Sequence, residues 1–107
     1  ASGWSGLMAV AGATYPEEAR VLREAMPEAL FLVPGYGAQG GTAMDAAHSF
    51  DREGLGAIVN ASRSLIYAYQ SDHWRNSYDE SKYCDAARAE ALSMKEDLNR
   101  AIKGNRA

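Results

Sequence analysis

Residues 7 to 33 read LMAVAGATYPEEARVLREAMPEALFLV, in which two short apolar runs flank a segment rich in charged residues. The runs at 7–14 and 29–33 are nearly continuous in apolar side chains, which is typical of strands buried on both faces of a parallel sheet. The segment between them has the length and spacing of a helix. This order of strand, helix and strand predicts a parallel βαβ unit with a right-handed crossover.

The helix of this unit is predicted to begin at Thr14, because Glu17 follows three residues later at the spacing of a capping box. We expect the helix to end near Met26. Ala19, Leu22 and Met26 recur at intervals of three and four and define its buried stripe. Charged residues occupy the remaining surface, which we expect to face water: Glu17, Glu18, Arg20, Arg23 and Glu24.

The same alternation continues after the second strand. A glycine-rich loop, PGYGAQGG at 34–41, is followed by a helix predicted from Thr42 to Gly54, and GAIVNAS at 56–62 is typical of a third strand. A glycine at the end of a helical run is a usual stop signal. The chain is therefore expected to be an α/β protein with a parallel sheet.

A different pattern follows residue 69. The polar stretch QSDHWRNSYDES at 70–81 leads into a long helical run with one narrow apolar stripe, which we expect to dock on the body of the protein or on a partner. The stripe consists of Cys84, Ala87, Ala91, Met94, Leu98 and Ala101. We therefore divide the chain into an α/β part at 1–69 and a polar connection with a C-terminal helix at 70–107.

Composition narrows the class of protein. With 107 residues, 47% of them hydrophobic and 23% charged, the chain has the size of one folded domain or of part of one. The net charge of −3, with Lys and Arg scattered along the sequence, argues against a nucleic-acid surface. No apolar stretch is long enough to cross a membrane, and the start ASGWSG lacks the features of a secretory signal. We expect a cytoplasmic protein.

The sequence offers no metal site. Cys84 is the single cysteine, and His48 and His73 lie far from it, so no spacing typical of metal ligands is present. A single cysteine also forms no internal disulfide, which fits a reducing compartment. His48 lies late in the predicted second helix, and we assign it no role.

The candidate site lies where two strands are predicted to end. Ligands of parallel α/β proteins bind at the carboxyl ends of strands, and both 34–41 and NASRS at 60–64 occupy such ends. Glycine backbones can bring N–H groups close to an anion, and Gln39 offers an amide. Arg63 can give a phosphate a planar pair of donors, with serine hydroxyls such as that of Ser62 beside it. This pattern favours a phosphate site.

A purely structural interpretation stays open at this point. The loop matches neither the Walker A pattern nor the dinucleotide fingerprint in its usual place after a first strand. Gly35 and Gly37 can serve a tight turn, and Arg63 can pair with a surface carboxylate such as Asp51.

Three segments carry a resemblance to a known family: VAGATYPEEARVLREAMPE, LFLVPGYGAQGG and AIVNASRSLIYAY, in this order and spacing. They resemble the closing part of orotidine 5′-phosphate decarboxylase, in its long-chain bacterial subgroup, over about residues 7 to 69. The resemblance implies the C-terminal portion of a (β/α)8 TIM barrel, about strands six to eight with their helices. It also implies conversion of orotidine 5′-phosphate to uridine 5′-phosphate in de novo pyrimidine biosynthesis, without metal or organic cofactor.

The resemblance further implies a set of substrate-binding residues: Gln39, Arg63, Ser62, Gly40, Gly41 and Pro34. Gln39 would reach over the substrate to its phosphate, and Arg63 would bind the same phosphate. The backbone at Ser62 and the two close-packed glycines would line the phosphate pocket. Pro34 would shape the loop beside the pyrimidine.

One part of the family's pattern is absent from these 107 residues. The resemblance implies a catalytic Asp-x-Lys-x-x-Asp run on an earlier strand, in which the lysine protonates the departing carbon. No such run occurs here, and Lys82, Lys95 and Lys103 have no aspartates at the required offsets. We therefore assign no catalytic residue to this chain. We expect it to be inactive alone and to require the N-terminal part of the barrel, complete barrels then forming a homodimer.

Two hypotheses from different classes follow. The first is that the chain is the phosphate-binding part of the decarboxylase and works only with the part that carries the lysine and aspartates. The second is a non-catalytic half-barrel module that binds a phosphorylated ligand or associates with itself. Intact mass and oligomeric state distinguish them.

Overall fold

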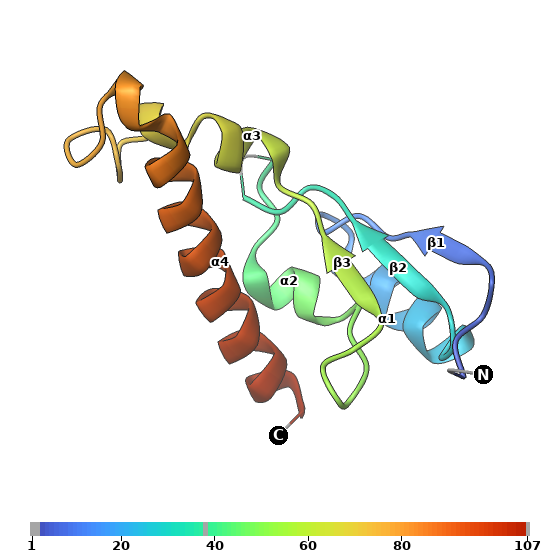
Figure 1. Cartoon of the computed structure of the whole chain (residues 1–107). Coiled ribbons are helices and arrows are strands. Elements are labelled where there is room, and N and C mark those ends of the chain that lie inside the picture. The colour runs from blue at the N-terminus through green and yellow to red at the C-terminus, as the bar shows by residue number, and fades with distance from the viewer. Residues whose placement is uncertain (1–2, 38, 107) are drawn as a thin grey trace.

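Three short strands form a parallel sheet in the order β1-β2-β3, and the long C-terminal helix runs beside it (Figure 1). The computed structural model describes residues 3–37 and 39–106. Its elements are β1 at Met8–Val10, α1 at Pro16–Ala25, β2 at Leu30–Val33, α2 at Ala43–Ala47, β3 at Ala57–Val59, α3 at Ser62–Ile66, two 3-10 turns at Ala68–Gln70 and Glu80–Lys82, and α4 at Tyr83–Arg106. The predicted α/β class with parallel strands is confirmed.

The two faces of the sheet differ, because strand side chains alternate between them. On one face, Phe31 and Val33 are fully buried and pack in a core with residues of α1, α2 and α4. On the other, Val10, Leu32 and Ile58 form one row across the strands and are 67%, 36% and 58% exposed. We call the face that carries these three side chains the open face. The prediction that the first strand is buried on both faces is therefore wrong.

Helix α1 begins without a side-chain cap. Its N-cap residue is Tyr15, and a proline occupies the first turn, where its missing N–H leaves no helical hydrogen bond unmade. The capping box expected at Thr14 and Glu17 is therefore wrong. A capping box forms at α2 instead, where Thr42 Oγ1 accepts the Asp45 N–H and Asp45 Oδ2 accepts the Thr42 N–H. The predicted buried stripe of α1 is confirmed, since its three residues pack in the core.

Arg23, predicted to face water, is buried between α1 and the start of the strands. Its Nε donates to Ser49 O at 2.8 Å, and one of its terminal nitrogens donates to Ala29 O and Gly56 O, both at 2.9 Å. The guanidinium carbon also lies 3.8 Å from the centroid of the Phe31 ring. Burial lowers the pKa of Arg23 from its usual value, while Asp51 acts in the opposite direction.

Helix α2 is shorter than predicted. It ends at Ala47 and does not continue to Gly54. The chain turns after it, because Asp51 Oδ1 accepts the backbone N–H groups of Glu53 and Leu55 and so stabilises a tight connection to β3.

Helix α4 docks along α2 and α3 (Figure 1), as the apolar stripe predicted. Met94 and Ala101 of that stripe are buried, and Leu98 is half-buried. Cys84 and Ala91 are exposed, so the stripe is buried over part of its length only. Within the described ranges, no helix is long and apolar enough to span a bilayer.

Candidate functional site

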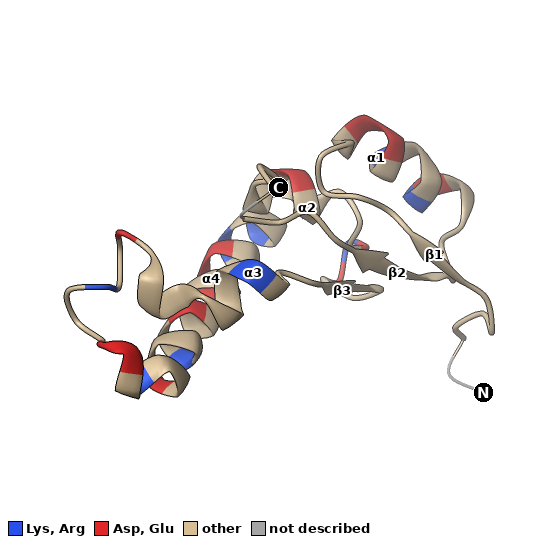
Figure 2. Cartoon of the chain, turned by 90° about the horizontal axis from the view of Figure 1, so that it is seen from above, with Lys and Arg blue, Asp and Glu red and all other residues tan. Residues whose placement is uncertain are grey.

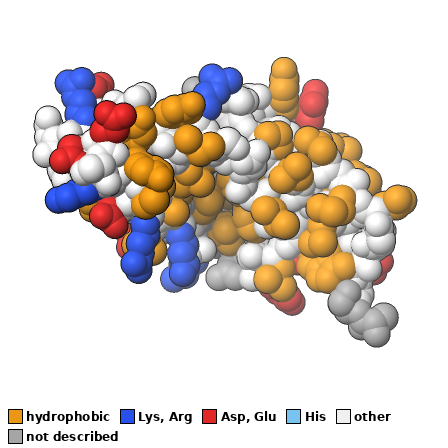
Figure 3. All heavy atoms as spheres, turned by 45° about the horizontal axis from the view of Figure 1, so that its top comes forward, with side chains coloured by type: hydrophobic (Ala, Val, Ile, Leu, Met, Phe, Trp, Pro, Cys, Tyr) orange, Lys and Arg blue, Asp and Glu red, His pale blue; other side chains and the backbone are white. Residues whose placement is uncertain are grey.

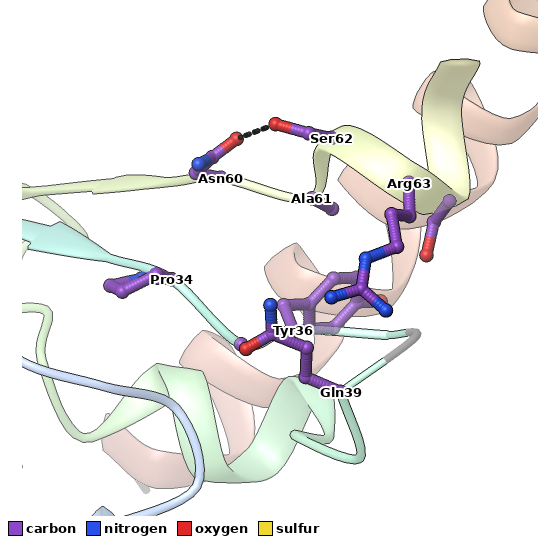
Figure 4. Close-up of a pocket in the computed structure, with 9 residues that line it drawn as sticks. Pro34, Tyr36, Gln39, Asn60, Ala61, Ser62 and Arg63 are labelled. Carbon is purple, nitrogen blue, oxygen red and sulfur yellow. Dashed lines mark hydrogen bonds between the residues drawn. The ribbon is translucent and has the colours of Figure 1, made fainter. Parts of the chain in front are cut away.

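The loops that follow β2 and β3 meet around one cavity. The cavity has a volume of ≈ 80 Å³ and lies at the carboxyl ends of both strands (Figure 4). Its lining residues are Pro34, Gly35, Tyr36, Gln39, Asn60, Ala61, Ser62, Arg63 and Ser64. One buried water needs about 10–15 Å³ in this measure, so the cavity has room for a group the size of a phosphate. Four of the six predicted site residues line it, and Gly40 and Gly41 lie outside the lining.

The glycine loop is held by hydrogen bonds of its own. Gly37 N donates to Gly41 O, Gly41 N to Gly35 O, and Gly40 N to Gly37 O, each at 2.9 Å. Gly35, Gly37 and Gly40 have φ of 93°, 80° and 97°, a backbone region that residues other than glycine rarely adopt. The N–H groups of Gly37, Gly40 and Gly41 are thus already donated, and in this conformation these glycines give the loop its shape.

Gly41 is required by packing. A Cβ at this position would lie 2.6 Å from Ala13 Cβ and 2.6 Å from Gly35 O. The turn after β1 therefore packs closely against the glycine loop at Gly41. Pro34 O strengthens this contact by accepting the Ala13 N–H at 2.7 Å.

Arg63 is the one charged residue of α3, and charges lie on helices and connections but not on the strands (Figure 2). Its side chain is exposed and extends from α3 toward the glycine loop, over the region of Tyr36 and Gln39 (Figure 4). No described carboxylate lies within ion-pair distance of it. The alternative pairing with Asp51 is not found, because that carboxylate caps the turn before β3, at the opposite end of the strand.

The other predicted polar residues approach the same cavity. Gln39 is exposed, and its Oε1 lies beside Gly35. Ser62 Oγ donates to Asn60 Oδ1 at 3.0 Å. Around the cavity are therefore one guanidinium, two side-chain amides and serine hydroxyls, a donor-rich set that suits an anionic group.

Two lining residues were not predicted from the sequence. Tyr36 is buried in the same core cluster as Met94 of α4, and it lines the cavity. Burial raises the pKa of Tyr36, and the nearby carboxylates of Asp97 and Glu90 act in the same direction. Tyr36 is the single aromatic residue of the loop, and this feature of the sequence could have indicated its burial. Asn60 was visible as the first polar residue after an apolar strand.

Metal ligation finds no support in the part of the chain that the structure describes, where no three His, Cys, Asp or Glu residues gather as a metal site would require. His48 is the C-cap of α2, and it is not among the residues that line the cavity.

Comparison with known proteins gives one consistent answer, although no family model matches the chain. This chain is 46% identical over 98 residues to an orotidine 5′-phosphate decarboxylase of Rhodopirellula baltica. The aligned region covers 92% of this chain and 32% of that protein. The chain is 43% identical over 104 residues to one of Caldicellulosiruptor bescii, covering 94% of this chain and 31% of the relative. The chain thus spans about a third of the length of these relatives, and the similarity extends beyond residues 7 to 69 into the C-terminal helix.

A solved structure agrees with these sequences. A crystal structure described as an orotidine-monophosphate decarboxylase from Toxoplasma gondii superposes on the chain with a TM-score of 0.62 and 25% identity. The superposition covers 92% of this chain and 30% of that one. Together with the parallel strands and the open face, this agreement identifies the fold as part of a TIM barrel.

Proposed function

This chain is homologous to orotidine 5′-phosphate decarboxylases over 92% of its length, and from that premise we propose that it supplies the phosphate-binding part of such an enzyme. The complete barrel would convert orotidine 5′-phosphate to uridine 5′-phosphate. The strands here would be about the sixth to the eighth of that barrel. The cavity at their carboxyl ends would hold the phosphate of substrate and product.

The observation that carries this proposal is the setting of Arg63. A guanidinium without a described carboxylate partner faces a small cavity that a glutamine amide and serine hydroxyls also line. Arginine binds phosphate with two parallel N–H donors, and a hydrogen bond to a charged group contributes roughly 1.5–3 kcal/mol net. Arg63 and Gln39 would provide most of the phosphate affinity, with Ser62 and Pro34 shaping the cavity around it.

The role of this site in the reaction would be indirect. Binding energy from a remote phosphate favours the geometry in which the reacting atoms meet their catalytic groups. The proton donor would come from another segment, because the Asp-x-Lys-x-x-Asp run does not occur in these residues. We assign no catalytic residue and no cofactor to this chain.

The open face supports the need for that other segment. Its row of Val10, Leu32 and Ile58 is apolar and exposed, and Figure 3 shows hydrophobic side chains gathered over the half of the molecule that holds the sheet. In a TIM barrel, such side chains fill the interior together with those of the remaining strands. The rest of the barrel is therefore the first partner we propose, and a homodimer of complete barrels the second.

Replacement of Arg63 tests the proposal. In Arg63→Ala we expect the affinity for uridine monophosphate, measured by calorimetry, to fall about 10- to 100-fold, because a charge-assisted pair of hydrogen bonds is lost. Uridine, which has no phosphate, should bind equally to both proteins. Arg52→Ala is the matched control, because Arg52 is exposed in the turn before β3, away from the cavity. Equal losses for uridine and its monophosphate would remove Arg63 from this role.

The exposed open face also supports a second candidate function, that of a non-catalytic half-barrel module. A half-barrel module that associates with itself would cover the same apolar row with a second copy. Sedimentation of the purified chain, together with its intact mass, separates the candidates. A stable oligomer of the 107-residue chain that binds uridine monophosphate but gives no turnover with the catalytic segment would favour the module.

A further inference from the structure

The cavity lies at the carboxyl edge of the open face. Tyr36, which shares a core cluster with Met94 of α4, lines it together with Gly35 and Gln39 of the glycine loop. Pro34 and Asn60 lie two residues beyond Leu32 and Ile58, so the alternation of side chains places them on the open face, at its carboxyl edge. A ligand whose phosphate sits beside Arg63 and that extends over the open face passes these two residues, which both line the cavity.

The backbone fixes the position of Asn60. Its N–H donates to Val33 O at 3.0 Å, which extends the β2–β3 pairing by one residue. Figure 4 shows the side chains of Asn60 and Ser62 on one side of the chain and that of Ala61 on the other. Ala61 is buried and packs in the core. Asn60 therefore cannot turn toward the helices without displacing a core residue.

The amide of Asn60 is also oriented. Its Oδ1 accepts the hydroxyl of Ser62 at 3.0 Å, which leaves Nδ2 as the group that points away from Ser62 (Figure 4). Among the described residues, Nδ2 donates to no protein acceptor. A carboxamide nitrogen carries two N–H donors and suits a neutral acceptor oxygen as well as an anion.

From this arrangement we infer that Asn60 is a specificity-determining residue, whose Nδ2 donates to an acceptor oxygen on the organic part of the phosphorylated ligand. The inference rests on the proposed phosphate site and names what lies next to it. In uridine monophosphate, the acceptor is a ribose or pyrimidine oxygen. Arg63 and Gln39 bind the phosphate, and Asn60 distinguishes a nucleotide from phosphate alone.

Binding of three probes to Asn60→Ala tests this assignment. Uridine monophosphate should bind about three- to tenfold more weakly than to the unaltered chain, because one neutral hydrogen bond is lost. Inorganic phosphate should bind equally to both. Ribose 5-phosphate locates the acceptor: an affinity loss equal to that of the nucleotide places it on the ribose, and no loss places it on the pyrimidine. Either result supports the inference.

Asn99→Ala is the matched control, because Asn99 is an exposed asparagine of α4 that does not line the cavity. Asn60 is exposed as well, so its truncation should leave the fold intact, and circular dichroism checks this. An equal loss of affinity for inorganic phosphate and the nucleotide would overturn the inference, since Asn60 would then bind the phosphate. Unchanged nucleotide affinity would overturn it too. If the nucleotide instead bound no better than uridine to the unaltered chain, the phosphate site itself would fail.

Discussion

At the scale of single residues, Arg23 is a buried charge whose hydrogen bonds link the segments that precede β2 and β3. Besides its bonds to the segments before β2, β3 and the turn after α2, one guanidinium nitrogen donates to Met26 O and Pro27 O at 3.1 and 3.3 Å. Five carbonyl groups thus share one side chain. A guanidinium has five donors in a fixed plane, whereas a lysine ammonium has three and no plane.

We expect Arg23→Ala to lower the free energy of unfolding by roughly 2–4 kcal/mol, because buried carbonyl groups lose a charged donor and a cavity forms beside Phe31. Urea denaturation followed by circular dichroism measures the change. Arg20→Ala, one turn away on α1, is the control: Arg20 makes exposed ion pairs with Glu17 and Glu24, which contribute about 0–1 kcal/mol. Similar losses in both variants would mean that the buried bonds contribute little.

At the scale of the elements, local patterns predicted which segments are strands and helices but not how far they extend. Each predicted strand is present, yet β1 covers only Met8–Val10. An apolar run indicates burial, but Val10 is exposed because no described segment covers this face of the sheet. The capping box at Thr14 failed because Tyr15 ends the turn after β1 and takes the N-cap position. Competition between such local signals is decided by tertiary packing.

The candidate site was predictable to a similar extent. The carboxyl ends of two parallel strands meet by topology, so the pairing of the glycine loop with the segment around Arg63 followed from the sequence. The donation of loop N–H groups to loop carbonyls depends on backbone angles that a sequence does not display. The burial of Tyr36 likewise depends on α4, which lies about 50 residues later in the chain.

The glycine loop docks on α3 through Gly37, and this contact gives a prediction. A Cβ on Gly37 would lie 2.6 Å from Ser64 Oγ, whereas a Cβ on Gly40 would meet nothing within 4 Å. Both have positive φ, so alanine costs about 1–2 kcal/mol of backbone strain at either position. Gly37→Ala should therefore weaken uridine monophosphate binding several-fold more than Gly40→Ala, as measured by calorimetry. Equal effects would show that backbone strain alone matters and that the contact with α3 does not.

At the scale of the whole molecule, the chain presents the cavity beside Arg63 at the carboxyl edge of a sheet whose open face is exposed. The row of Val10, Leu32 and Ile58 and the two outer strand edges would be covered once the remaining strands pair with β1 and β3. The same closure would place catalytic groups from those strands above the cavity. Stability and activity are therefore expected to depend on the same event.

This dependence leads to the prediction for catalysis. Decarboxylation leaves a carbanion-like centre that needs a positioned proton donor, and phosphate binding alone only helps to reach the geometry in which that donor acts. The 107-residue chain by itself should give no measurable conversion of orotidine monophosphate. Refolding with a segment that carries the Asp-Lys-Asp strand should restore turnover, measured by the loss of orotidine absorbance.

The restored enzyme should then respond to changes in the phosphate site in a defined way. Arg63→Ala or Gln39→Ala should raise the substrate concentration needed for half-maximal rate. Arg52→Ala is the control, because it removes a positive charge away from the cavity. Mass spectrometry must exclude contaminating full-length decarboxylase in both samples. Turnover by the lone chain under these conditions would contradict the assignment, because a proton donor would then have to lie within these residues, among Lys82, Lys95 and Lys103. Substitution of each lysine by methionine would identify it.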